Sequence, residues 1–158
     1  GVAGVYATVA AAAARLADAG GDDATENREL AIRLDEAILS AQPRAEESLR
    51  RLARSAEQAG ELAKAAECWR TIFAASPQGS PTWFEARFNS LRLVAKVDPA
   101  RAREGLAQHR LLFPDFGPPP WGERIRELSE QLQGSSPAEP AEDAAQPPRT
   151  RAGQGGGR

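Results

Sequence analysis

The sequence of 158 residues contains one cysteine and one histidine, and this scarcity excludes several kinds of site. Cys68 has no second cysteine with which to form an intramolecular disulfide or a cysteine-rich metal cluster. His109 has no second histidine and lies on a different predicted helix from Cys68, so the ligand spacing of a zinc site does not occur. We therefore predict no metal site.

The residue groupings that support catalysis are also absent from the sequence. Cys68 has no local signature of a base or an oxyanion site, so we interpret it as a small, half-buried thiol. No glycine-rich phosphate loop precedes a predicted helix. Carboxylates alternate with arginines on predicted helix faces, where Glu46 with Arg50 and Glu47 with Arg51 have the i,i+4 spacing of ion pairs. We predict no catalytic residues, no enzymatic activity and no cofactor.

The charge balance does not favour nucleic acid as a partner. The formal net charge is −2, which produces no large field of one sign around the molecule. Arginine outnumbers lysine 18 to 2, a bias that indicates a GC-rich, bacterial coding sequence and no particular function. We predict no nucleic-acid partner and no small-molecule substrate, and the compartment stays open.

Residues that favour β-strands are few and scattered, whereas alanine, leucine, glutamate and arginine are abundant over residues 1–133. The sequence therefore predicts an all-α fold. Glycine and proline separate the predicted helices. These helices comprise residues 2–19, 26–41, 43–59, 61–75, 81–97, 99–113 and 121–133. Residues 134–158 have no aromatic side chain to bury, so we predict a disordered tail after a single domain of residues 1–133.

A repeat length is visible in the middle of the chain. Pro43 and Pro77 are 34 residues apart, with Gly60 at the turn between two helices of similar length. Ala65 occupies the small position where these helices cross, and Trp69 follows one turn later. The first of the two helices carries an apolar stripe of Leu49, Leu52, Ala53 and Ala56. This pattern resembles one unit of the tetratricopeptide-repeat (TPR) family.

The flanking helices resemble weaker units of the same family. Ala102 and Leu106 take the small and large positions after the turn at Asp98, and Ala31 takes the small position of the first pair. The resemblance implies pairs at residues 2–41, 44–76 and 81–113, wound as a right-handed superhelical stack. The helix over residues 121–133 would cap the stack through Trp121, Ile125, Leu128 and Leu132.

The resemblance also implies a function, because the first helices of TPR units line a concave groove that binds proteins or peptides. We expect this chain to be a non-enzymatic interaction scaffold. Arginine and asparagine on such a groove favour an acidic peptide. The polar faces of the helices over residues 43–59 and 81–97 supply the candidate partner-binding residues Arg50, Arg51, Arg54, Asn89, Arg92 and Lys96.

The N-terminal segment is unusually apolar. Residues 2–14 carry no charge, but 13 residues are too few to span a bilayer, so we expect a helix buried between neighbours and no membrane contact. The start at Gly1 indicates a fragment or a processed form of a larger protein. Two alternatives to the scaffold stay open. One is an accessory domain of a larger enzyme, and the other is a self-associating array stacked through this apolar helix.

Overall fold

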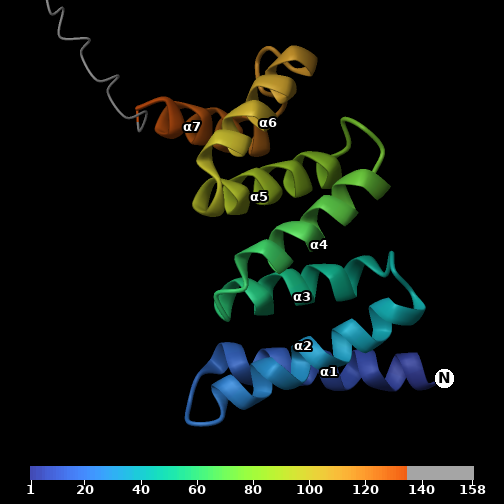
Figure 1. The fold of residues 1–158 in the computed structure, drawn as a ribbon. Coiled ribbons are helices and arrows are strands. Elements are labelled where there is room, and N and C mark those ends of the chain that lie inside the picture. The colour runs from blue at the N-terminus through green and yellow to red at the C-terminus, as the bar shows by residue number, and fades with distance from the viewer. Residues whose placement is uncertain (135–158) are drawn as a thin grey trace, which may run out of the picture.

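A computed structural model describes residues 1–134, and these residues form seven α-helices and no strand (Figure 1). The all-α prediction is confirmed. The predicted disordered tail lies outside the described residues, except for Gly134, which is the last residue of the seventh helix. The helices are α1 (Val2–Ala19), α2 (Ala24–Ala41), α3 (Glu46–Gln58), α4 (Leu62–Ala75), α5 (Pro81–Val97), α6 (Pro99–Leu112) and α7 (Trp121–Gly134).

Each helix packs against the next one along the chain. The chain runs back and forth, so that successive helices form an ascending stack from α1 and α2 to α6 and α7 (Figure 1). Short connections between helices of similar length favour this antiparallel packing. α7 contacts both α5 and α6 and covers the end of the stack, as the sequence predicted. The arrangement is compatible with a helical repeat.

Two of the predicted helix starts are confirmed in detail. Pro81 is the first residue of α5, and the Ser80 hydroxyl accepts a hydrogen bond from the backbone N–H of Trp83 at 3.2 Å. Pro99 is the first residue of α6, and the Asp98 carboxylate accepts one from the N–H of Arg101 at 3.0 Å. Proline suits this position because its missing N–H has no partner there in any case.

The predicted start of α3 at Pro43 is wrong. Pro43 lies in a turn ahead of the helix, which begins at Glu46 with Ala45 as its N-cap. The backbone N–H of Ala45 donates to the carbonyl of Gln42 across that turn, at 3.0 Å. The turn between α3 and α4 agrees with the prediction, because Gly60 has a φ of 81°, a conformation that favours glycine.

Small residues lie where the helices cross. Ala56 of α3 and Ala65 of α4 are both fully buried and pack in one cluster with Leu93 of α5. Ala31 and Ala102, the small residues predicted for the outer pairs, are also fully buried. The larger cluster lies at the C-terminal end of the stack, where Ile125, Leu128 and Leu132 of α7 pack on Trp83, Phe84, Leu91 and Leu106. The predicted inner face of α7 is confirmed.

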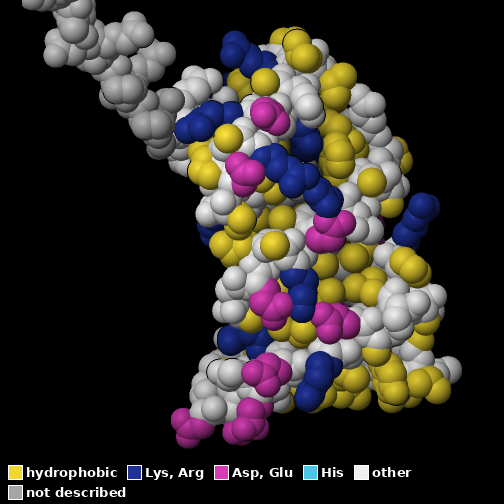
Figure 2. Space-filling view, viewed as in Figure 1, with side chains coloured by type: hydrophobic (Ala, Val, Ile, Leu, Met, Phe, Trp, Pro, Cys, Tyr) yellow, Lys and Arg dark blue, Asp and Glu magenta, His cyan; other side chains and the backbone are white. Residues whose placement is uncertain are grey.

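α1 differs from the expectation that it is buried between neighbours. Its alanines face inward, with Ala10, Ala13 and Ala17 buried, and its larger side chains face outward. Hydrophobic side chains accordingly gather over the N-terminal part of α1, at the lower right of Figure 2. The exposed large residues of this helix are Val2, Val5, Tyr6, Val9 and Leu16.

At 18 residues, α1 is also the one helix within residues 1–134 with the length and apolar composition of a membrane span, which is weak evidence by itself.

Ala65→Leu should lower the free energy of unfolding by about 1–3 kcal/mol, because the added side chain has no space between α3 and α4. Ala63→Leu is the matched control, since Ala63 lies on the same helix and is exposed. Urea unfolding followed by circular dichroism measures both variants. Equal destabilisation by the two substitutions would contradict the assigned crossing position.

Candidate functional site

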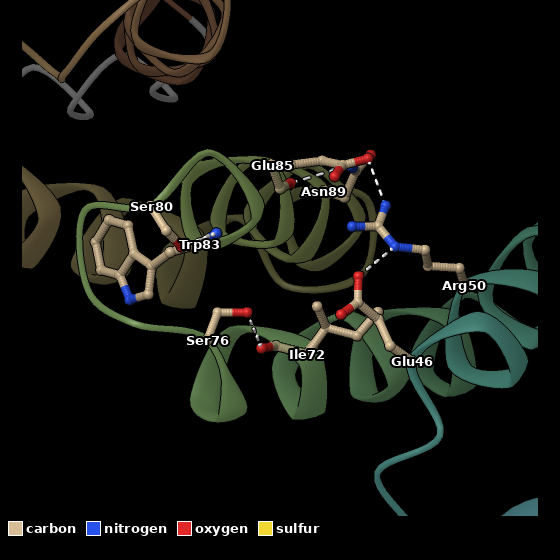
Figure 3. A network of polar contacts seen from close by, with 8 residues as sticks. All are labelled: Glu46, Arg50, Ile72, Ser76, Ser80, Trp83, Glu85 and Asn89. Carbon is tan, nitrogen blue, oxygen red and sulfur yellow. Dashed lines mark hydrogen bonds and ion pairs between the residues drawn. The ribbon is translucent and has the colours of Figure 1, made fainter.

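The predicted binding residues lie on α3 and α5. Most of them contact polar or charged side chains of the same two helices. Arg50 extends from α3 between two carboxylates (Figure 3). Its Nε donates to Glu46 of the same helix at 2.8 Å, and its Nη1 donates to Glu85 of α5 at 2.8 Å. The predicted pairing of Glu46 with Arg50 is confirmed. The second ion pair connects α3 to α5, so the positive charge of Arg50 is compensated within the fold.

Arg92 makes a second connection between the same two helices. Its guanidinium donates to both carboxylate oxygens of Glu57 on α3, at 2.5 and 2.9 Å, and Lys96 lies 3.4 Å from the same carboxylate. These contacts, led by the hydrogen bonds from Arg92, lower the pKa of Glu57 and keep it ionised. Asn89 donates to the backbone carbonyl of Glu85 at 3.0 Å and accepts from Arg92 at 3.2 Å.

The structure therefore corrects the predicted charge pattern of this surface. Three of the predicted cations, Arg50, Arg92 and Lys96, contact carboxylates of α3 or α5. Along the contact between α3 and α5, which we call the seam, each of these cations lies beside a carboxylate. The excess of positive charge expected there from Arg50, Arg92 and Lys96 is therefore absent. That these residues bind a partner stays a prediction.

Arg51 is directed away from this seam and into the interface with α2. Its Nε and Nη2 donate to the two carboxylate oxygens of Asp35, at 2.9 and 2.5 Å. Asp35 is fully buried; burial raises its pKa, and the hydrogen bonds from Arg51 oppose that effect. The predicted pairing of Arg51 with Glu47 is wrong, because Asp35 is the nearer carboxylate once α2 packs on α3. Arg51 thus fixes the position of α3 on α2.

Arg54 is the predicted cation that has no carboxylate partner. It is exposed and lines a groove of about 290 Å³ between α1 and α3, opposite Arg15 of α1. Within residues 1–134, neither Arg15 nor Arg54 forms an ion pair. The sequence analysis missed Arg15, because α1 was interpreted only as an apolar helix. The remaining lining consists of Ala11, Ala14, Asp18, Glu47, Arg50 and Arg51.

Four arginines and two carboxylates line the groove, and Ala11 and Ala14 form its small apolar part. Asp18 accepts a hydrogen bond from Gln58 at 2.8 Å, and Glu47 is exposed at the edge of α3. Arg50 and Arg51 are committed to carboxylates that do not line the groove. The charged side chains left for a ligand are therefore Arg15 and Arg54, with two carboxylates, Asp18 and Glu47, beside them.

Cysteine and histidine often act in catalysis, and the one cysteine and one histidine of this sequence are both buried. Burial raises the pKa of Cys68 to about 11, so its thiol is protonated near neutral pH and is a poor nucleophile. His109 is fully buried, and its Nε2 lies 3.0 Å from the carbonyl of Phe116. Its ring packs against those of Trp83, Phe84, Phe113 and Phe116. His109 thus attaches α6 to the segment that leads into α7, a role that the sequence did not reveal.

Within residues 1–134, the structure contains no cluster of histidine, cysteine and carboxylate side chains that could hold a metal ion. Compared with models of known protein families and with curated protein sequences, the chain matches none. The candidate site therefore rests on the geometry and charge of the groove between α1 and α3.

Lowering the pH should destabilise the protein through His109. Burial lowers the pKa of His109 in the folded state, whereas the unfolded chain binds the proton near the ordinary value. The stabilisation is complete above that ordinary value and is lost as the pH falls from about 6.5 towards the lower pKa of the folded state, by at most roughly 1.4 kcal/mol for each pH unit in that interval. Chemical unfolding between pH 5.5 and 7.5 measures this dependence.

His109→Gln is the control for this measurement, because His109 is the only histidine in the sequence. The variant should be less stable at pH 7.5 but should lose less stability on acidification than the wild type. The same loss in both proteins would show that another group, and not His109, produces the pH dependence.

Proposed function

We propose that this protein is a non-enzymatic interaction scaffold with a TPR-like superhelical arrangement. In this proposal, the groove between α1 and α3 holds an extended acidic segment of another protein. The stacked helices support the scaffold role, because they provide a rigid surface. The repeat length between Pro43 and Pro77 supports the family resemblance.

One observation carries the choice of ligand. Arg15 and Arg54 lie on facing helices, line the same groove and have no carboxylate partner within residues 1–134. A guanidinium group presents two parallel N–H donors that fit the two oxygens of a carboxylate. The floor between them consists of Ala11 and Ala14, whose small side chains leave space for a peptide backbone. An acidic side chain therefore fits between the two arginines.

The paired residues have a different role in this proposal. Arg50 and Arg92 connect α3 to α5, and Arg51 connects α3 to α2, so α3 is held from both sides. A binding residue on a helix whose position is fixed loses little freedom when the ligand arrives. Asn89 and Lys96 belong to the same supporting network and not to the contact surface.

An acidic peptide should bind the wild-type protein with an affinity that falls as salt is added, because exposed charges are screened beyond about 8 Å at physiological ionic strength. The double variant Arg15→Glu, Arg54→Glu should lose at least tenfold in affinity, since two attractive contacts become repulsive. Fluorescence anisotropy with a labelled glutamate-rich peptide, at low and high salt, measures both effects. The fold should remain intact, because both residues are exposed.

The matched control is the double variant Arg33→Glu, Arg124→Glu. Both of these arginines are exposed, and neither lines the groove. This control makes the same change in net charge, so it should retain most of the affinity. If it lost binding to the same extent, the peptide would be responding to overall charge, and the assigned groove would be wrong.

Self-association through α1 is a second candidate function. Val2, Val9 and Leu16 are exposed and seven residues apart, and Val5 lies between the first two in the spacing of a coiled-coil seam. No charge interrupts residues 2–14. When two copies of α1 pair in antiparallel orientation, their Arg15 side chains lie towards opposite ends of a seam about 27 Å long, so like charges do not meet. A second copy of the chain is therefore the partner that fits this face.

Val5→Glu should shift the protein towards monomers, because it places a charge in the seam. Val97→Glu is the matched control, since Val97 is 60% exposed and Val5 is 61% exposed, but Val97 lies on α5. Sedimentation velocity over a hundredfold range of concentration measures the oligomeric state. A wild-type protein that stays monomeric throughout, or an equal effect of both substitutions, would contradict the second candidate.

A further inference from the structure

Arg87 is a half-buried cation without a counter-charge. It lies on α5, and within residues 1–134 no carboxylate forms an ion pair with it. Its Nη2 donates to the backbone carbonyl of Gly105 at 2.7 Å, and its guanidinium carbon lies 5.1 Å from the centre of the Phe73 ring. Its Nε is buried and has no hydrogen-bond partner among the described residues. A partly buried charge in this state is costly unless an opposite charge approaches it.

The position of Arg87 depends on a close approach between α5 and α6. A Cβ atom added at Gly105 would lie 2.6 Å from the Leu91 side chain of α5, so that side chain would have to move to admit a larger residue. Glycine therefore permits the contact that brings the Gly105 carbonyl within reach of Arg87. The hydrogen bond fixes one end of the guanidinium, and no residue in the described part of the chain bonds its Nη1.

Two adjoining clefts, of about 460 and 280 Å³, share Arg87 in their linings. Ser90 also lines both clefts; its side chain is 6% exposed, and its hydroxyl has no hydrogen-bond partner within residues 1–134. Arg70 is the third residue common to both. Arg44 lines the first cleft and Arg101 lines the second; both are exposed, and neither forms an ion pair within residues 1–134.

Two carboxylates also lie along these clefts, and they do not cancel the positive charge. Glu67 contacts Arg70 in an i,i+3 ion pair. Glu104 is exposed at the edge of the second cleft and forms no ion pair with Arg87 or Arg101. The half-buried cation at the bottom of the clefts is therefore left without compensation, and the arginines around it add to its attraction for an anion.

We propose that the clefts between α4, α5 and α6 form an oxyanion-binding site, with Arg87 and Ser90 at its base and Arg70 and Arg101 at its edge. A phosphate or a carboxylate group supplies the acceptor oxygens that the free N–H groups and the Ser90 hydroxyl require. This site is formed by different helices from the groove that contains Arg15 and Arg54. It does not depend on the proposed peptide function.

The test is a titration of the protein with inorganic phosphate and, separately, with glutarate, at constant ionic strength maintained with sodium chloride. Nitrogen–proton correlation spectra report the side-chain Nε–H of each arginine and the backbone amide of Ser90. We expect a saturable shift of the Arg87 and Ser90 signals. Saturation with phosphate alone assigns the site to phosphate groups, and saturation with glutarate alone assigns it to carboxylates. Saturation with both shows a general oxyanion site.

Four variants make the test specific. Arg87→Gln should abolish saturable binding, and Ser90→Ala should weaken it about tenfold, since a hydrogen bond to a charged group is lost. Arg33→Gln, on an exposed arginine of α2, should leave binding unchanged. If Arg87→Gln does not fold, Ser90→Ala and Arg101→Gln still decide the question. The proposal would be overturned if no signal saturated, or if chloride gave an equal response. It would also be overturned if Ser90→Ala and Arg101→Gln both kept wild-type affinity.

Discussion

The distance between neighbouring helices is set by alanine, and the remaining features of this protein depend on that distance. Ala56 and Ala65 are fully buried where α3 crosses α4, and Ala102 is fully buried on α6. Small residues at such crossings allow two helix backbones to approach closely, and interiors packed to crystal-like density do not tolerate added volume there. Because the helices lie close, side chains of ordinary length reach across from one pair to the next.

The ion pairs between α3 and α5 follow from this spacing. Arg50 with Glu85 and Glu57 with Arg92 are each separated by 35 residues, close to the repeat length seen in the sequence. One step of the stack therefore brings equivalent faces of two helices side by side, and the polar residues on those faces neutralise one another. Charges remain free where the stack provides no partner, as at Arg15 of α1 and Arg54 of α3.

The sequence predicted the helices and their inner faces well, because both depend on local chemistry and on periodicity. Proline and glycine placed most of the helix ends, and the small residues placed the crossings. The partners of charged side chains could not be predicted in this way. Periodicity shows which face of a helix a residue occupies, but not which residue of another helix lies opposite. Arg51 therefore contacts the buried Asp35, and His109 lies fully buried in an aromatic cluster.

The arginines of this chain share one chemistry but lie in very different surroundings. Arg87 and Arg92 lie on the same helix, about 140° apart around its axis. Glu57 neutralises Arg92, whereas Arg87 faces a cleft and has no carboxylate partner within residues 1–134. In a sequence with 18 arginines, their number and helical position therefore indicate little about binding. The informative quantity is the charge left uncompensated after folding, which separates the supporting arginines from those that can receive a ligand.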